Sequence, residues 1–273
     1  MTVEKSRARD TGGPSGRLFV GGLGIDRLTE SDVVDRVQQG WLEAQGGVIV
    51  TPNVDIWRMC RNDDECRALV DAASMVVADG MPLLWASTLA GSPLPGRVTG
   101  SGLVETLSAA AARNHRSVYI IGGGVGETCL RAAHALSERY PGLNVAGAVA
   151  PPFGFDRDPA MLDGVVEAAA LSGAGLYLIG LGFPRQDRLG ALIVQRCPAA
   201  WALGCGGGIA MAAGDVIRAP GWVQRGGIEW IGRLLMEPRR LARRYLVDDI
   251  PAALRLLAIS ASTRFGAKKD PEP

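Results

Sequence analysis

The chain has 273 residues, 47% of them hydrophobic and 21% charged, and a formal net charge of +1. These values are typical of a globular protein. Five cysteines without a CxxC pair and only two histidines leave little material for disulfides, a zinc site or a histidine-based triad. No run approaches the ~18 apolar residues of a membrane-spanning helix, and residues 1–16 lack the apolar stretch of a signal peptide, so we expect a cytoplasmic protein.

Apolar runs that predict strands alternate with segments that predict helices from residue 17 onward. Strands are expected at 17–22, 48–52, 75–78, 118–122, 143–149, 176–180 and 201–204. Helices are expected at 29–44, 53–59, 63–73, 82–90, 126–139, 158–171 and from 184. Residues 91–102, rich in glycine and proline, predict an irregular loop that crosses the binding site. The alternation predicts an α/β fold with a doubly wound, mostly parallel sheet.

The composition changes near residue 218. We expect a catalytic core at 17–217, a helical appendage at 218–262 and disordered tails at 1–16 and 263–273. Residues 218–246 carry seven arginines against Glu229 and Glu237, with tryptophan, isoleucine and leucine between them. This pattern is typical of amphipathic helices that lie at a lipid surface or over an anionic ligand. The alternative is a helical hairpin packed on the core with solvated arginines, and nucleic acid is a weaker third partner.

Five of the apolar runs end in polar or glycine-rich clusters, and ligands of open α/β sheets bind beside the carboxyl ends of the strands. The sequence therefore indicates an enzyme. Asp79 follows one such run and precedes Gly80, where an apolar crevice would raise the pKa of a carboxylate toward that of a useful base. The alternative is that Asp79 caps the helix started by Pro82, and its position favours neither reading.

Two other strand ends carry neutral polar side chains. Thr51 and Asn53 could orient a sugar hydroxyl, although Asn53 could instead cap the next helix. Gln186 can donate to and accept from one ligand, and Asp187 follows it, but the start of a capped helix is the competing interpretation. Two strand ends with amide side chains favour a polar ligand such as a sugar.

Glycines and acidic residues suggest two further sites. Gly122, Gly123 and Gly124 lie between a strand and a helix, where free backbone N–H groups can bind phosphate, but the run is neither a dinucleotide fingerprint nor a Walker motif. Asp156 and Asp158 spell the DxD of metal-dependent sugar transferases. We favour Asp158 as the N-cap of a helix that begins at a proline, and we expect no metal ligand.

Several motifs in one order resemble those of the WecG/TagA/CpsF glycosyltransferases, glycosyltransferase family 26, from about residue 18 to 250. They are TPN at 51–53, ADG at 78–80, LPGRVTGSGL at 94–103, IIGGG at 120–124, RYPGL at 139–143, GLGFPRQD at 180–187, RAP at 218–220 and EWIGRLLMEPRRLARRYL at 229–246. The resemblance implies a Rossmann-like core with a C-terminal appendage. It also implies an inverting, metal-independent transfer of a sugar from a UDP-sugar to a polyprenyl-diphosphate-linked saccharide, in cell-envelope or exopolysaccharide synthesis at the inner face of the cell membrane.

The resemblance assigns roles to single residues. It makes Asp79 the general base, with Thr51 and Gln186 as the other catalytic residues. Appendage arginines would reach over the site to the diphosphate, a contact suited to a guanidinium group. The predicted substrate-binding residues are Asn53, Gly80, Arg97, Gly122, Gly123, Gly124, Asp187, Arg233, Arg240 and Arg243. Asp187 replaces the family's usual glutamate and PPFGF at 151–155 departs from its usual pattern, which leaves the identity of the sugar open.

Two other functional classes remain as alternatives. One is a membrane-peripheral protein that binds polyprenyl phosphates or a nucleotide without chemistry. The other is a nicotinamide oxidoreductase, which shares the fold class but would need the glycine fingerprint that this chain lacks. The sequence leaves the acceptor saccharide and homo-oligomer formation open.

Overall fold

The computed structural model describes residues 16–122, 127–216 and 243–266. Its centre is a six-stranded parallel sheet of the order β4-β3-β8-β7-β5-β6. The strands are β3 (Gly47–Val50), β4 (Met75–Val76), β5 (Val118–Gly122), β6 (Val145–Val149), β7 (Leu176–Gly180) and β8 (Trp201–Gly204). All run in one direction, so their carboxyl ends meet at one edge. The predicted α/β fold with a parallel sheet is confirmed.

Helices cover both faces of the sheet. One face packs on α1 (Glu30–Leu42), α5 (Gly100–Arg113), α6 (Thr128–Arg139) and α9 (Gly208–Ala212). The other packs on α2 (Val54–Asn62), α3 (Asp64–Asp71), α4 (Met81–Leu89), α7 (Pro159–Leu171) and α8 (Arg185–Arg196). A single 3-10 turn, η2 (Phe155–Arg157), precedes α7. Successive strand residues point to opposite faces of the sheet. Leu178 therefore packs on the face covered by α1, α5, α6 and α9, while Tyr177 and Ile179 pack on the other face.

Local capping signals explain where several helices begin. Thr29 and Asp32 form the predicted capping box of α1. Asp158 accepts hydrogen bonds from Ala160 and Met161, so it is the N-cap of α7 as expected. In both helices the cap lies within three positions of the groups that it bonds, which is why sequence reasoning could find it.

Two local predictions are wrong. The single strand expected at 17–22 is a hairpin of β1 (Leu18–Val20) and β2 (Leu23–Ile25), because Gly21 and Gly22 turn the chain at φ +56° and +88°. The irregular loop expected at 91–102 ends earlier, because Thr99 caps α5, which begins at Gly100. The polar and glycine-rich start of α5 concealed that helix.

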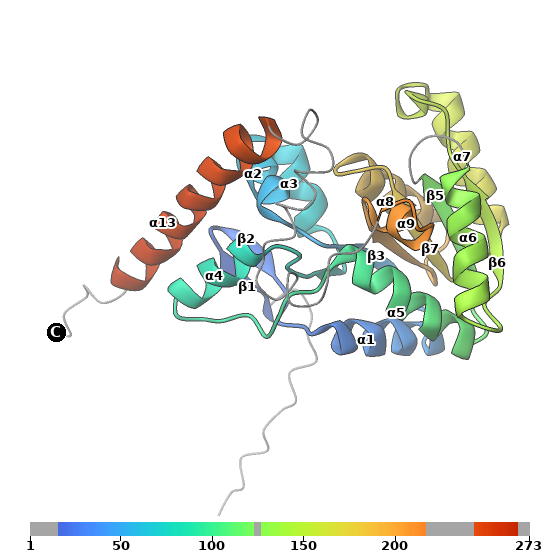
Figure 1. Cartoon of the computed structure of the whole chain (residues 1–273), viewed down its shortest axis with the longest axis horizontal. Helices are drawn as coiled ribbons and strands as arrows, with labels where there is room; N and C mark the ends of the chain where they lie inside the picture. The colour runs from blue at the N-terminus through green and yellow to red at the C-terminus, as the bar shows by residue number, and fades with distance from the viewer. Residues whose placement is uncertain (1–15, 123–126, 217–242, 267–273) are drawn as a thin grey trace, which may run out of the picture.

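The C-terminal elements pack on the core. The π-helical segment η3 (Arg243–Asp249) leads into α13 (Ile250–Gly266), which lies along α4 and α2 (Figure 1). Ala252 and Leu256 are buried in the same core cluster as Trp57. The predicted tail 263–273 overlaps the end of α13, and the predicted core–appendage boundary lies outside the described residues. None of the helices in the described ranges is both long and apolar enough to cross a bilayer.

Candidate active site at the carboxyl edge of the sheet

Asp79 and Thr51 lie on neighbouring strand ends. Pairing between β3 and β4 continues past the strands, since the N–H of Val77 donates to the carbonyl of Val50 (3.0 Å) and that of Asp79 to Pro52 (2.8 Å). Asp79 is half-buried, and Thr51 is buried with its hydroxyl 3.5 Å from the carbonyl oxygen of Gly204. The backbone thereby holds a carboxylate and a hydroxyl at one corner of the sheet edge.

The capping interpretations have opposite outcomes for Asn53 and Asp79. The side-chain Oδ1 atom of Asn53 accepts from the backbone N–H groups of Asp55 and Ile56, each at 3.1 Å, so Asn53 caps α2. The N-cap of α4 is Gly80 rather than Asp79. A Cβ atom on Gly80 would lie 3.4 Å from the Cα of Asn53, which shows how closely the two strand ends approach. Asn53 is therefore occupied as a helix cap.

The segment before α5 runs beside Asp79. The N–H of Val98 donates to the carbonyl of Ala78 at 2.9 Å, which places half-buried Arg97 next to the end of β4. A Cβ atom on Gly100 would lie 3.2 Å from the hydroxyl of Thr51 and 3.1 Å from the Cα of Cys205. Sequence reasoning missed the close approach of Gly100. The TGSG run between two apolar segments could have indicated a helix start at the site.

Gln186 joins two glycine loops. Its Oε1 atom accepts from the N–H of Gly182 at 3.1 Å and from the N–H of Gly206 at 3.0 Å, and the side chain is 5% exposed. Gly182 follows β7 and Gly206 follows β8. The amide oxygen of Gln186 therefore fixes the shape of the loops, since a buried acceptor shared by two donors stabilises both.

Asp187 lies beneath the edge and not in it. Its side chain is 2% exposed, and neither carboxylate oxygen has a hydrogen-bond partner among the described residues. Burial, opposed in part by the neighbouring Gln186 side chain, raises the pKa of Asp187 to about 7. A Cβ atom on Gly204 would lie 2.6 Å from Oδ1 of Asp187, so the carboxyl group packs against the backbone of β8. Substrate contact predicted for Asp187 would require this packing to open.

Glycines at three strand ends let the backbones approach closely. Gly122 has φ +91°, and a Cβ atom there would lie 2.8 Å from the carbonyl oxygen of Gly180. A Cβ atom on Gly180 would likewise lie 2.7 Å from the carbonyl oxygen of Gly206. Sequence reasoning singled out Gly122 but missed the contacts of Gly180 and Gly204. Their common signal is glycine as the last residue of an apolar run. Gly123 and Gly124 lie outside the described residues.

The appendage contributes one described candidate. Arg243 is exposed at the start of η3, and η3 packs on α2, the helix that begins at Asn53. Arg233 and Arg240 lie outside the described residues. No group of three or more histidine, cysteine, aspartate or glutamate side chains suited to a metal ion occurs within residues 16–122, 127–216 and 243–266.

A carboxylate, a buried hydroxyl and a row of close-packed glycines at the carboxyl edge of a parallel sheet define a ligand-binding α/β enzyme. The model of the glycosyl transferase WecG/TagA/CpsF family matches residues 18–265. The chain therefore belongs to the WecG/TagA/CpsF family of glycosyltransferases, as its motifs predicted. This membership favours the transferase over the binding-protein and oxidoreductase alternatives.

Two relatives are named for one reaction. A Bacillus spizizenii protein is 28% identical over 231 residues, 83% of this chain and 86% of its own length. A Staphylococcus aureus protein is 28% identical over 248 residues, 89% of this chain and 91% of its own length. Both are N-acetylglucosaminyldiphosphoundecaprenol N-acetyl-beta-D-mannosaminyltransferases.

Proposed function

We propose that this enzyme transfers an N-acetylmannosamine-type sugar from a UDP-sugar to a polyprenyl-diphosphate-linked saccharide, with inversion at the anomeric carbon. Family membership and the names of the two relatives support the reaction class and the acceptor class. The observation that carries the proposal is the position of Asp79. Its backbone is tied to Pro52 and lies beside the segment of Arg97, at the sheet edge where ligands of this fold class bind.

In the proposed step, a hydroxyl oxygen of the acceptor sugar attacks the anomeric carbon of the donor. The bond from that carbon to the UDP oxygen breaks, and UDP leaves with the bonding electron pair. The carboxylate of Asp79 takes the hydroxyl proton, so charge and atoms balance without a covalent enzyme intermediate. Thr51 holds the neighbouring strand end in place through Gly204 and lies next to the N-terminus of α5.

Stabilisation of the departing diphosphate is assigned to the glycine loops and to cationic side chains. Gln186 orders the loops at Gly182 and Gly206, whose neighbouring backbone N–H groups can donate to anionic oxygens. Arg243, with Arg233 and Arg240 of the appendage, would supply the positive charge that a metal ion supplies in other transferases. The proposal therefore includes no metal cofactor.

Because the proposed acceptor is a lipid, the enzyme would act at a membrane surface. The C-terminal elements η3 and α13 have an exposed apolar face that could contact that surface. Leu246, Val247, Ile250 and Leu254 are exposed apolar side chains of η3 and α13, while Ala252 and Leu256 face the core. This division supports peripheral docking of the same helix that packs on the core. We assign the enzyme to the inner face of the cell membrane on this basis and leave its oligomeric state open.

Replacement of Asp79 by asparagine tests the base. UDP release from UDP-N-acetylmannosamine is measured with a short-chain N-acetylglucosaminyl-diphosphate lipid as acceptor, and the variant should lose about 10²–10⁴-fold in turnover. Asp158→Asn is the matched control, because asparagine caps α7 equally well and also removes the second acid of the DxD sequence. That control should keep wild-type turnover with and without EDTA. Near-normal turnover of Asp79→Asn would remove the base assignment, and loss of wild-type turnover in EDTA would remove the metal-free assignment.

A further inference from the structure

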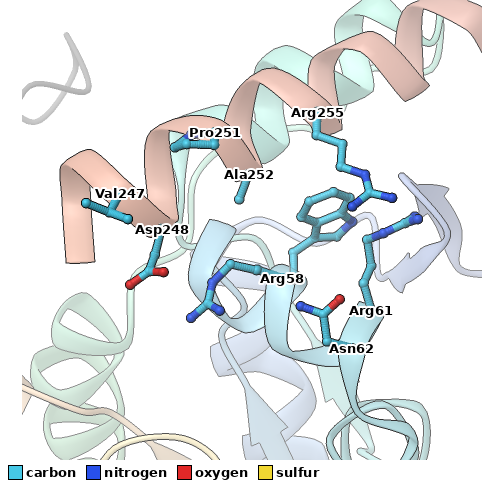
Figure 2. A pocket seen from close by; sticks show the side chains of 9 residues that line it. Arg58, Arg61, Asn62, Val247, Asp248, Pro251, Ala252 and Arg255 are labelled. Carbon is cyan, nitrogen blue, oxygen red and sulfur yellow. The ribbon is translucent and has the colours of Figure 1, made fainter. Parts of the chain in front are cut away.

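A cavity of 250 Å³ lies between α2 and the C-terminal elements η3 and α13 (Figure 2). Arg58 and Arg61 reach it from α2, and Arg255 reaches it from α13. Trp57, which is buried, also lines the cavity. The cavity thus combines guanidinium groups from two segments that are almost two hundred residues apart in sequence.

One of these arginines is neutralised within the protein. The Nη2 atom of Arg58 lies 2.7 Å from a carboxylate oxygen of Asp55, and this hydrogen bond raises the pKa of Arg58. Asp248 of η3 also lines the cavity and points toward Arg58 in Figure 2. The carboxylates at this end therefore balance Arg58.

The other two arginines, Arg61 and Arg255, have no carboxylate paired with them in the described part of the chain. Among the residues that the structure describes, neither Arg61 nor Arg255 forms an ion pair. Arg61 stacks on Trp57, with its Cζ atom 5.4 Å from the ring centroid. Figure 2 shows the side chains of Arg61 and Arg255 on the same side of the cavity. Two guanidinium groups at one end of a cavity repel each other, and a bound anion would offset that repulsion. Asn62 lines the same cavity and adds an amide donor.

We propose that Arg61 and Arg255 bind a phosphate group, at a second site distinct from the sheet edge. Guanidinium groups prefer phosphate because their planar donors can make two parallel hydrogen bonds to it. The sites are separated along α2, which begins after Asn53 at the edge. Arg61 lies about 12 Å further along that helix at 1.5 Å per residue.

The phosphate could belong to a soluble ion or to a lipid headgroup. Val247 lines the cavity and is 62% exposed, and Leu254 on the next element is 64% exposed. An acyl chain could contact these side chains while its phosphate lies between the arginines. The shared chemistry is the phosphate, and the site does not depend on the identity of the transferred sugar or on Asp79.

The test uses the full-length protein saturated with UDP, so that the donor site is occupied. Inorganic phosphate and monomeric dihexanoyl phosphatidate are titrated by calorimetry at constant ionic strength. Arg61→Gln and Arg255→Gln should each weaken binding about tenfold, which corresponds to about 1.4 kcal/mol, because each change removes a charge-assisted hydrogen bond to the phosphate. Arg113→Gln, an exposed arginine of α5, is the matched control and should change affinity less than about twofold. Asp248→Asn removes a negative charge from the cavity and should strengthen binding by about two- to fivefold.

Tighter binding of the phosphatidate than of inorganic phosphate would identify a lipid headgroup as the source, whereas equal affinities would identify a soluble phosphate. Either result supports the proposed site if both arginine variants bind the ligand more weakly than the wild type. Absence of binding to the wild type, or unchanged affinity in both variants, would overturn it. Arg61 and Arg255 are exposed, so unchanged melting temperatures are expected and can be checked by circular dichroism. Transfer to a soluble acceptor should stay at the wild-type rate in both variants, which separates this test from that of Asp79.

Discussion

The Oε1 atom of Gln186 accepts a hydrogen bond from the backbone N–H of Gly206 at 3.0 Å, and so ties helix α8 to the loop after β8. The same atom accepts from Gly182. Replacement by leucine would remove the buried oxygen that accepts both of these part-buried hydrogen bonds. We expect Gln186→Leu to lower the free energy of unfolding by about 2–4 kcal/mol, measured by urea denaturation. Gln195→Leu, at an exposed position of the same helix, should change it by less than about 0.5 kcal/mol. Equal effects of the two changes would contradict a structural role for the Gln186 amide.

The buried carboxyl of Asp187 should make stability depend on pH. Burial raises its folded-state pKa from 3.8 to about 7, so the folded protein binds more protons than the unfolded chain between those values. The free energy of unfolding should therefore fall as the pH rises from about 4 to 7. Above that range the buried carboxylate is fully ionised, and the free energy of unfolding should fall no further on its account. Asp187→Asn removes the titrating group, so urea denaturation at pH 5 and pH 8 should show a smaller decrease than in the wild type.

A control for Asp187 is Asp64→Asn, at an exposed position in the first turn of α3. This variant should keep the wild-type decrease in stability between pH 5 and pH 8. If Asp187→Asn also kept that decrease, titration of Asp187 would not be its origin.

Two glycines should respond oppositely to alanine. A Cβ atom on Gly180 would lie 2.7 Å from both the Gly206 carbonyl oxygen and the Ile209 Cδ1 atom, so Gly180→Ala must displace the loop after β8. Gly164 lies in α7 with nothing within 4 Å of such an atom, so Gly164→Ala should stabilise the protein by about 0.5–1 kcal/mol. Of the two variants, only Gly180→Ala should have a lower melting temperature in thermal unfolding and a lower affinity in UDP-binding titration. A Gly180→Ala variant with wild-type melting and binding would show that the glycine contacts are dispensable.

The packing of α13 can be tested with two leucines of one helix. Leu256 is 0% exposed and lies against Trp57 and Gly21, whereas Leu254 is 64% exposed. Leu256→Ala should lower the free energy of unfolding by about 2–5 kcal/mol, because it opens a cavity in a closed core. Leu254→Ala should leave that quantity within about 0.5 kcal/mol of wild type. Similar losses in urea denaturation would mean that α13 is not held by its Leu256 face.

Local patterns predicted most of the fold. The α1 capping box and the Asp158 cap of α7 depend on groups within a few residues of each other. The apolar runs that became β5, β7 and β8 were visible for the same reason. The hairpin of β1 and β2 and helix α5 were missed where glycine hid the pattern. The grouping of Thr51 and Asp79 at one edge followed from parallel strands, since their carboxyl ends must meet.

Apart from the β1–β2 hairpin and helix α5, the sequence by itself determined the order of strands and helices. It also determined the family and the strand ends that carry polar side chains. Only the tertiary structure decided what those side chains do. Gln186 and Asp187 are adjacent, yet the amide joins two loops while the carboxyl is buried against Gly204. Asn53 proved to be a helix cap, and Arg61 lines one cavity with Arg255 from the far end of the chain. Burial and hydrogen-bond partners depend on residues distant in sequence, so no local pattern contains them.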